Sequence, residues 1–209
     1  MMTYEYEKTE NKLETYEWDN IWWEYANDSE GKERILIIGD SISVGVRNII
    51  NRCYEGKKYV DNLGTSKSVD NPFLMPMIDY MIAQCKNCNI IQFNNGLHGW
   101  HLNTEQYKEY LDKTVSWILE KYPEKKLILA LTTPLREKED ISKIAERNSI
   151  VIERNGAMLE IAEKYGLKVN DLYSQIADKP ELYSTDGVHL TDEGYEVLAK
   201  HTISVFRKE

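Results

Sequence analysis

The sequence has few cysteines, no long apolar segment and no excess of positive charge, and each absence excludes a class of protein. Three cysteines among 209 residues are too few for a disulfide framework. No apolar run approaches the roughly 20 residues that a transmembrane helix needs, so we expect no membrane partner. The net charge of −9 argues against nucleic acid or an anionic membrane as the main partner, because both require a basic surface.

The first 20 residues are polar and acidic, without the basic start and apolar middle of a secretory signal. This composition favours the cytoplasm, where cysteines stay reduced. Cys85 and Cys88 form a C-x-x-C at the end of a predicted helix, with no second Cys or His pair at zinc spacing. His98 and His101 lack a suitably spaced carboxylate pair. We therefore expect three reduced thiols, no metal and no other cofactor.

Short apolar runs alternate with stretches of helical periodicity along most of the chain. The runs are rich in Ile, Leu and Val and do not alternate with polar residues, which is typical of strands buried on both faces. They cover residues 34–39, 58–63, 89–94, 126–132 and 167–172. The predicted helices cover residues 43–54, 73–86, 104–122, 142–165 and 192–207. This order predicts an α/β fold, a three-layer α/β/α sandwich around a five-stranded parallel sheet.

The chain length favours one compact domain at residues 34–209, preceded by a tryptophan-rich extension at residues 1–33. We expect this extension to pack on the core. Trp18, Trp22 and Tyr25 share one face if the segment is helical. Such a helix can dock its aromatic side chains on the core, or it can hold a tryptophan over the active site. Both interpretations stay open, and the sequence carries no indication of an oligomeric state.

A serine follows the first predicted strand directly. Gly39 allows a sharp turn, and Ser41 then falls at the start of a helix, where free N–H groups and the helix dipole favour an oxyanion. Asp40 or Ser41 can equally serve only as a helix cap.

Two further loops carry polar residues to the same edge of the predicted sheet, where parallel α/β proteins bind ligands. Asn94 ends the third strand and can donate a hydrogen bond to an oxyanion, or can simply complete a turn. Asp186 and His189 stand three residues apart on one loop, so the carboxylate can reach the imidazole. Together with Ser41 they form a candidate nucleophile, base and orienting acid.

These motifs resemble the SGNH hydrolases, also called the GDSL esterase/lipase family, over residues 34–207. The first motif is Gly39-Asp40-Ser41-Ile42, and the last is Asp186-Gly187-Val188-His189. The resemblance implies a flavodoxin-like sandwich, with Ser41 as nucleophile, His189 as general base and Asp186 as its partner. Asn94-Asn95-Gly96 resembles the third motif, G-x-N-D, although Gln92 and Asn95 replace its Gly and Asp.

The second motif of the family, N-x-G-x-S-G, is matched by residues 62–67 with a lysine at the last position. The resemblance implies an oxyanion hole made by the backbone of Ser41, the backbone of Lys67 and the side chain of Asn94. Lysine adopts a positive φ less readily than glycine, so the loop path can differ and Gly64 is the alternative donor. The lysine side chain can also lie over the site and select a substrate.

Four residues are candidate substrate contacts: Asp40, Gly64, Trp100 and Arg136. Trp100 can stack on a substrate ring or bury itself. Arg136 follows the fourth strand and can face the pocket or form a surface salt bridge.

The sequence thus predicts a serine esterase that forms an acyl-serine intermediate on a small-molecule ester. An acetyl group on a sugar is favoured, because no apolar insertion is available to cover a long lipid chain. The alternatives are a thioesterase or lysophospholipase for longer acyl chains, an acyl transferase with the same triad, and a binding module that has lost activity.

Overall fold

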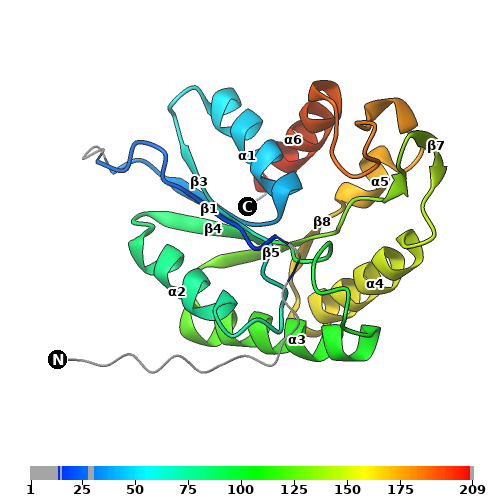
Figure 1. The fold of residues 1–209 in the computed structure, drawn as a ribbon. Helices are drawn as coiled ribbons and strands as arrows, with labels where there is room; N and C mark the ends of the chain where they lie inside the picture. Colours follow the sequence, from blue (N-terminus) through cyan, green and yellow to red (C-terminus); the bar gives the residue numbers. More distant parts are fainter. Residues whose placement is uncertain (1–13, 15, 28–30, 208–209) are drawn as a thin grey trace.

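The computed structural model describes residue 14, residues 16–27 and residues 31–207. Its main sheet has six strands in the order β1-β3-β2-β4-β5-β8 (Figure 1). Five of them are parallel, as predicted, and lie close to the expected positions: β2 Arg34–Gly39, β3 Tyr59–Thr65, β4 Cys88–Phe93, β5 Lys126–Ala130 and β8 Lys168–Asn170.

Helices cover both faces of this sheet, so the predicted three-layer α/β/α architecture is confirmed (Figure 1). One layer holds α1 Ser41–Tyr54, α5 Leu172–Ile176 and α6 Asp192–Phe206. The other holds α2 Leu74–Gln84, α3 Thr104–Lys121 and α4 Asn148–Tyr165. A short 3-10 helix, η1 Pro180–Leu182, precedes the loop before α6.

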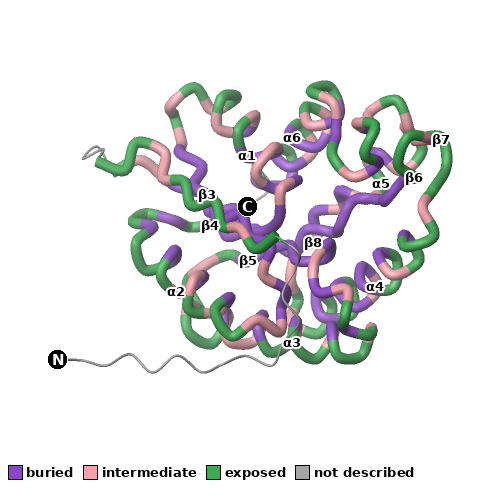
Figure 2. The backbone as a smooth tube through the Cα atoms, viewed as in Figure 1, coloured by how far each residue is buried: buried purple, intermediate pink, exposed green. Residues whose placement is uncertain are grey.

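Successive residues of β2 point into different cores. Leu36 and Ile38 belong to the cluster under α2, α3 and α4, whereas Ile35 and Ile37 belong to the cluster under α1, α5 and α6. All four side chains are fully buried, and Figure 2 shows the central strands as the most buried part of the molecule. Burial on both faces explains why the sequence of this strand shows no polar alternation.

Helix ends follow their capping residues. The side chain of Asp40 accepts the N–H of Ile42, so α1 begins at Ser41 and not at residue 43. Asn103 caps α3 through a capping box with Gln106, so α3 begins at Thr104.

The predicted helix around residues 16–27 is wrong. Asp19–Trp22 form strand β1, which pairs antiparallel with β3 and becomes the edge of the sheet. The open edge of β3 offers backbone donors and acceptors that a helix would leave unpaired. A spacing of four residues puts Trp18 and Trp22 on one face of a strand as well as of a helix, so their spacing alone did not separate the two.

The fourth helix starts later than expected. Residues 142–144 belong to a hairpin of β6 Arg136–Glu137 and β7 Asp140–Ile144, and α4 begins only at Asn148. The Asn148 side chain accepts the N–H of Leu135 and donates to the Tyr173 hydroxyl. These tertiary contacts fix the helix start, which local periodicity did not indicate.

No helix among the described residues is long and apolar enough to cross a bilayer. All three cysteines are free thiols, with Cys85 and Cys88 buried. The division into a 1–33 extension and a 34–209 domain stays a prediction, because residues 1–13, 15 and 28–30 lie outside the described part of the chain.

Candidate active site

Ser41 lies at the junction of β2 and α1, at the carboxyl edge of the parallel strands. Because Ser41 is the first residue of α1, its backbone N–H has no acceptor within the helix. Asp40, one residue earlier, is buried and caps the helix instead of facing a substrate. Burial raises the pKa of the Asp40 carboxyl, although His98 and the N–H groups of Ser43 and Ile42 act in the opposite direction.

The loop between η1 and α6 brings two side chains to Ser41. His189 Nδ1 lies 2.6 Å from Asp186 Oδ2, and His189 Nε2 lies 2.9 Å from Ser41 Oγ. The carboxylate can only accept hydrogen bonds, so it fixes the proton on Nδ1 and leaves Nε2 to accept the serine proton. The three residues named by the sequence motifs therefore form one continuous hydrogen-bonded chain.

Backbone contacts hold the carboxylate of this chain in place. Asp186 Oδ1 accepts the N–H groups of Val188 and His189, each at 2.9 Å. Burial raises the pKa of Asp186, but the hydrogen bonds from His189 and from the two N–H groups outweigh it and the net pKa is lowered. Asp186 is therefore ionised at neutral pH and can stabilise a positive charge on His189.

The loop also depends on Gly187, which has a φ of +74°. A Cβ at this position would lie 2.2 Å from the carbonyl oxygen of Arg136, so only glycine fits. The N–H of Arg136 in turn donates to the Gly187 oxygen at 2.8 Å. Hairpin β6–β7 thus supports the loop that carries His189.

The histidine and the carboxylate of this chain are open to solvent. The side chains of His189 and Asp186 are 46% and 44% exposed. Behind Ser41, a cavity lined by Asp40, Asn94 and Thr132 among others measures only ≈ 10 Å³. This is about the volume that one water needs, so this cavity cannot hold an acyl chain.

The Asn94 side chain points inward. Its amide donates to the carbonyl oxygen of Ala130 at 2.7 Å and to Thr132 Oγ1 at 3.0 Å. Both N–H groups of the predicted oxyanion donor are thus engaged within the protein. Asn95, the next residue, donates to the carbonyl oxygen of Lys67 and so joins the second and third motifs.

The second motif is held by the N-terminal strand. The Lys67 N–H, the other predicted oxyanion donor, donates to Thr65 Oγ1 at 3.1 Å. The Lys67 ammonium pairs with Asp19 at 2.7 Å and does not lie over the site as a free charge. Gly64 is a buried residue of β3, opposite Gly39 of β2.

Comparison with known proteins identifies the family of the chain. A model of the GDSL-like lipase/acylhydrolase family matches residues 93–197, half of the chain, which include Asn94, Asp186 and His189. The chain belongs to this family. The resemblance drawn from the sequence motifs is therefore confirmed.

A human relative of this GDSL-family chain is the isoamyl acetate-hydrolyzing esterase 1 homolog. It is 31% identical over 119 residues, which make up 52% of this chain and 48% of the human protein. The match thus spans about half the length of that relative.

Solved structures share the fold. The acetyl xylan esterase AlAXEase has a TM-score of 0.65 at 16% identity, covering 82% of this chain and 98% of that one. A GDSL-like lipase from Bacteroides thetaiotaomicron has a TM-score of 0.67 at 14% identity, covering 84% and 88% of the two chains. At such identities the likeness concerns the fold alone.

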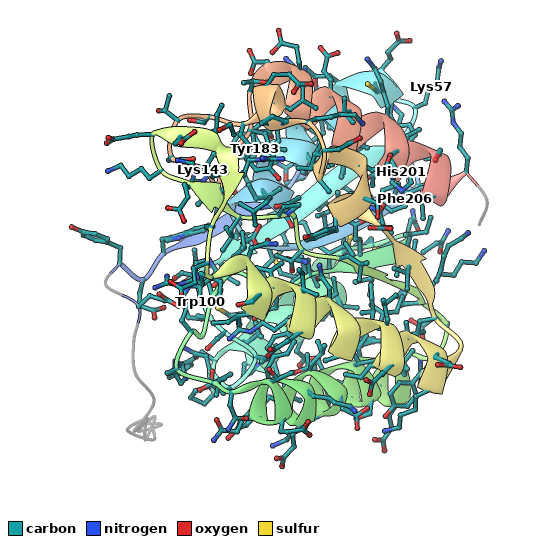
Figure 3. The ribbon with its side chains drawn as sticks, turned by 90° about the vertical axis from the view of Figure 1, so that its right-hand side faces the viewer. Lys57, Trp100, Lys143, Tyr183, His201 and Phe206 are labelled. Atoms are coloured by element: carbon teal, nitrogen blue, oxygen red, sulfur yellow. The ribbon has the colours of Figure 1, made fainter. Side chains whose placement is uncertain are left out.

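Two predicted substrate contacts of this GDSL-family protein have other partners. Arg136 is buried, donates to the carbonyl oxygens of Ile141 and Ala177, and stacks on Tyr183, so it neither faces a pocket nor forms a surface salt bridge. Trp100 lies near the start of α4, apart from Tyr183 and the β6–β7 hairpin (Figure 3). Two guanidinium groups, those of Arg147 and Arg154, lie 5.0 Å from its ring.

Sequence analysis missed a buried arginine and its neighbour that shape the site. Arg154 is fully buried and donates to the carbonyl oxygens of Gly96, His98 and Gly99. Asn155 accepts the N–H of Thr132 and donates to its oxygen, which fixes the end of β5. A signal was available: both residues fall on the apolar stripe of α4, where a polar side chain must find buried partners.

Among the described residues, no group of three or more His, Cys, Asp or Glu side chains is arranged to hold a metal. His101 Nε2 instead pairs with Asp70 Oδ2 at 2.8 Å. The side chains that meet at the GDSL motifs are a serine hydroxyl, an imidazole and a carboxylate.

Proposed function

We propose that the protein is a serine esterase that cleaves small acyl esters, most readily acetyl esters of a carbohydrate, through an acyl-serine intermediate. The observation that carries this proposal is the hydrogen-bonded chain from Ser41 through His189 to Asp186, with distances of 2.9 and 2.6 Å. Membership of a lipase/acylhydrolase family supports the same class of reaction.

In the first half of the reaction, Ser41 Oγ attacks the ester carbonyl carbon while its proton passes to His189 Nε2. The carbonyl π electrons move to oxygen and form a tetrahedral oxyanion. When the C–O bond to the alcohol breaks, His189 returns the proton to the leaving oxygen. In the second half, water takes the place of Ser41 as nucleophile and releases the acid.

The oxyanion is bound first by the Ser41 N–H, which lies at the N-terminal end of α1 where the helix dipole favours negative charge. We retain Asn94 as the second donor. Its amide can keep the bond to Ala130 and exchange the bond to Thr132 Oγ1 for one to the substrate oxygen when the oxyanion forms. The Lys67 N–H can serve only if its bond to Thr65 is broken, so we rank it third.

A small, uncharged substrate is supported by the surroundings of Ser41. The cavity behind the serine is too small for an acyl chain, and the histidine and carboxylate are open to bulky alcohols such as sugars. Phosphate-bearing substrates, such as coenzyme A thioesters or lysophospholipids, need cations nearby. Lys67 is neutralised by Asp19, and Arg136 is committed to carbonyl oxygens.

The names of two similar proteins point the same way. One relative is named as a homolog of an isoamyl acetate-hydrolyzing esterase, and one structural neighbour is an acetyl xylan esterase. Both descriptions concern acetyl esters, and the second concerns a sugar polymer. We extend the acetyl preference to this chain. The more specific part of the proposal is that the alcohol of the ester is a carbohydrate.

The test begins with p-nitrophenyl acetate and a fluorophosphonate probe. Wild-type protein is expected to hydrolyse the ester and to be labelled at Ser41, whereas Ser41→Ala abolishes both. Ser43→Ala, two residues along the same helix, is the matched control and should still be labelled. Labelling that persists in Ser41→Ala would remove this serine as the nucleophile.

The substrate class is tested with acetyl, butyryl and decanoyl esters and with an acetylated xylo-oligosaccharide. A preference for decanoyl esters would replace the proposal by the longer-chain alternative. Transfer of acetyl to an added sugar in place of water would identify a transferase. Hydrolysis of p-nitrophenyl acetate without any release of acetate from the oligosaccharide would limit the proposal to a non-carbohydrate acetate.

A further inference from the structure

Two tryptophans of the N-terminal segment, Trp22 of β1 and Trp18 just before it, approach residues of α1. The Trp22 ring lies 5.5 Å from the guanidinium of Arg47. Trp18 and Val44 both lie close to Gly64 of β3. Ser41, Val44 and Arg47 are spaced by three residues, so each lies about one helical turn from the next along the same side of α1. Moving along β1 from Trp22 to Trp18 therefore leads along α1 toward the nucleophile.

The absence of a side chain at Gly64 allows this close approach. A Cβ there would lie 2.4 Å from Val44 Cγ2 and 3.3 Å from Trp18 Cζ3. Gly64 is paired with Gly39, two residues before Ser41. Trp18 also meets the loop after the third motif, because its ring centroid lies 6.3 Å from that of His98. The indole is therefore bordered by the Val44 side of α1, by the second motif at Gly64 and by the loop that carries His98.

The position of Trp18 is fixed by polar contacts on either side. Its N–H donates to Ser66 Oγ at 2.9 Å, and its carbonyl oxygen accepts the Ser66 N–H at 3.1 Å. The next residue, Asp19, pairs with Lys67, and Glu14 accepts the N–H of Gly99. These contacts fix the backbone of Trp18, and its half-buried indole forms a wall beside Gly64 and His98.

The chemistry of the triad determines which part of an ester meets this wall. The leaving alcohol must lie beside His189, because His189 protonates it. The loop of His189 is supported by Arg136, which follows β5, whereas Trp18 precedes β1. In the order β1-β3-β2-β4-β5-β8, strands β5 and β1 lie on opposite sides of β2, the strand that leads into Ser41. The acyl group, opposite the leaving group, therefore points toward β3 and β1.

We propose that Trp18 is the residue that limits the length of the acyl group, by closing the β1 side of the acyl site against the Val44 side of α1. This assignment rests on the proposed esterase function. It gives residues of the N-terminal extension a direct role in substrate selection, in addition to their role as the edge strand of the sheet.

The test is a series at position 18, Trp18→Phe, Trp18→Leu and Trp18→Ala, measured with p-nitrophenyl acetate, butyrate and hexanoate. The ratio of kcat/KM for butyrate to that for acetate should rise as the side chain shrinks. Each methylene buried in the new space contributes about fourfold, and butyrate has two more than acetate, so Trp18→Ala should raise this ratio by up to about fifteenfold. Trp22→Ala is the matched control, since it removes an indole from the same face of β1 beside Arg47 and should leave the ratio unchanged.

The outcomes separate this proposal from the function on which it rests. A merely structural role for Trp18 lowers kcat/KM for all three esters by the same factor, and an unchanged ratio in folded Trp18→Leu and Trp18→Ala overturns the assignment. Wild-type protein that hydrolyses none of the esters refutes the esterase proposal itself. Melting temperatures identify folded variants, and if Trp18→Ala unfolds, Trp18→Phe and Trp18→Leu still give the trend.

Discussion

Two sides of the candidate active site are held by different kinds of contact. The His189 loop, residues 184–190, rests on hairpin β6–β7 and on Arg136, which is 5% exposed and donates to two backbone oxygens. The Lys67 loop, residues 64–67, rests on the N-terminal strand through an ion pair whose side chains are 13% and 36% exposed. One loop is fixed from within the core, the other from a partly exposed edge.

The difference separates two tasks that a serine esterase must perform. Proton transfer requires the Ser41–His189 distance to be kept within narrow limits, and buried charge-assisted hydrogen bonds can do this. Fitting a substrate requires a surface whose shape can change without disturbing the triad, and an edge strand provides one. We therefore expect changes on the His189 side to reduce turnover and stability, and changes on the Lys67 side to alter selectivity.

The largest effect is expected for Asp186→Asn. An amide can donate to Nδ1 and hold the wrong tautomer of His189, which lowers kcat by about 10⁴ in a serine protease triad. We expect a loss of that order with p-nitrophenyl acetate, with little change in melting temperature. Asp192→Asn, on the first turn of α6, is the control. A loss below tenfold would mean that Asp186 does not orient the base.

The next effect concerns the support of the His189 loop. Arg136→Ala leaves the oxygens of Ile141 and Ala177 without their donors and should reduce the free energy of unfolding by about 2–4 kcal/mol. Urea unfolding measures this change, and kcat should fall in the same variant. The exposed Arg52→Ala should cost less than about 1 kcal/mol. An equal loss of unfolding free energy in Arg136→Ala and Arg52→Ala would mean that the His189 loop is not fixed from within the core.

The sequence alone predicted the elements whose signals are local. The boundaries of β2 match the predicted run because Ile, Leu and Gly39 mark both its burial and its end. Asp186 and His189 were found because three-residue spacing on one loop already implies contact. Neither inference needed knowledge of distant parts of the chain.

The remaining features depend on contacts between distant segments. The orientation of the Asn94 amide is set by Ala130 and Thr132, more than 30 residues away in sequence. Strand β1 was predicted as a helix because its pairing with β3 is nonlocal and its tryptophan spacing fits both structures. Arg154 shows the intermediate case, in which a polar residue on an apolar stripe indicated burial but not its partners.

A smaller effect tests the Lys67 side of the comparison. We expect the Lys67–Asp19 ion pair to contribute about 0.5–1 kcal/mol to stability, since both side chains retain contact with water. A double-mutant cycle with Lys67→Met and Asp19→Asn, followed by urea unfolding, measures this coupling. A coupling above about 2 kcal/mol would mean that the Lys67 loop is held as firmly as the His189 loop, and would contradict the proposed difference between them.

The smallest effect concerns Asp40, which lies between the two loops. Because burial raises its pKa, the folded state binds the proton more tightly than the unfolded state, where the pKa is near the ordinary 3.8. Stability due to this group is therefore lost as pH rises from about 3.8 through the pKa in the folded protein. Asp40→Asn keeps the oxygen that caps α1 but cannot ionise. Wild type should lose stability relative to this variant as the pH rises above about 3.8 in urea unfolding, whereas a constant difference would mean that the Asp40 carboxyl has an ordinary pKa.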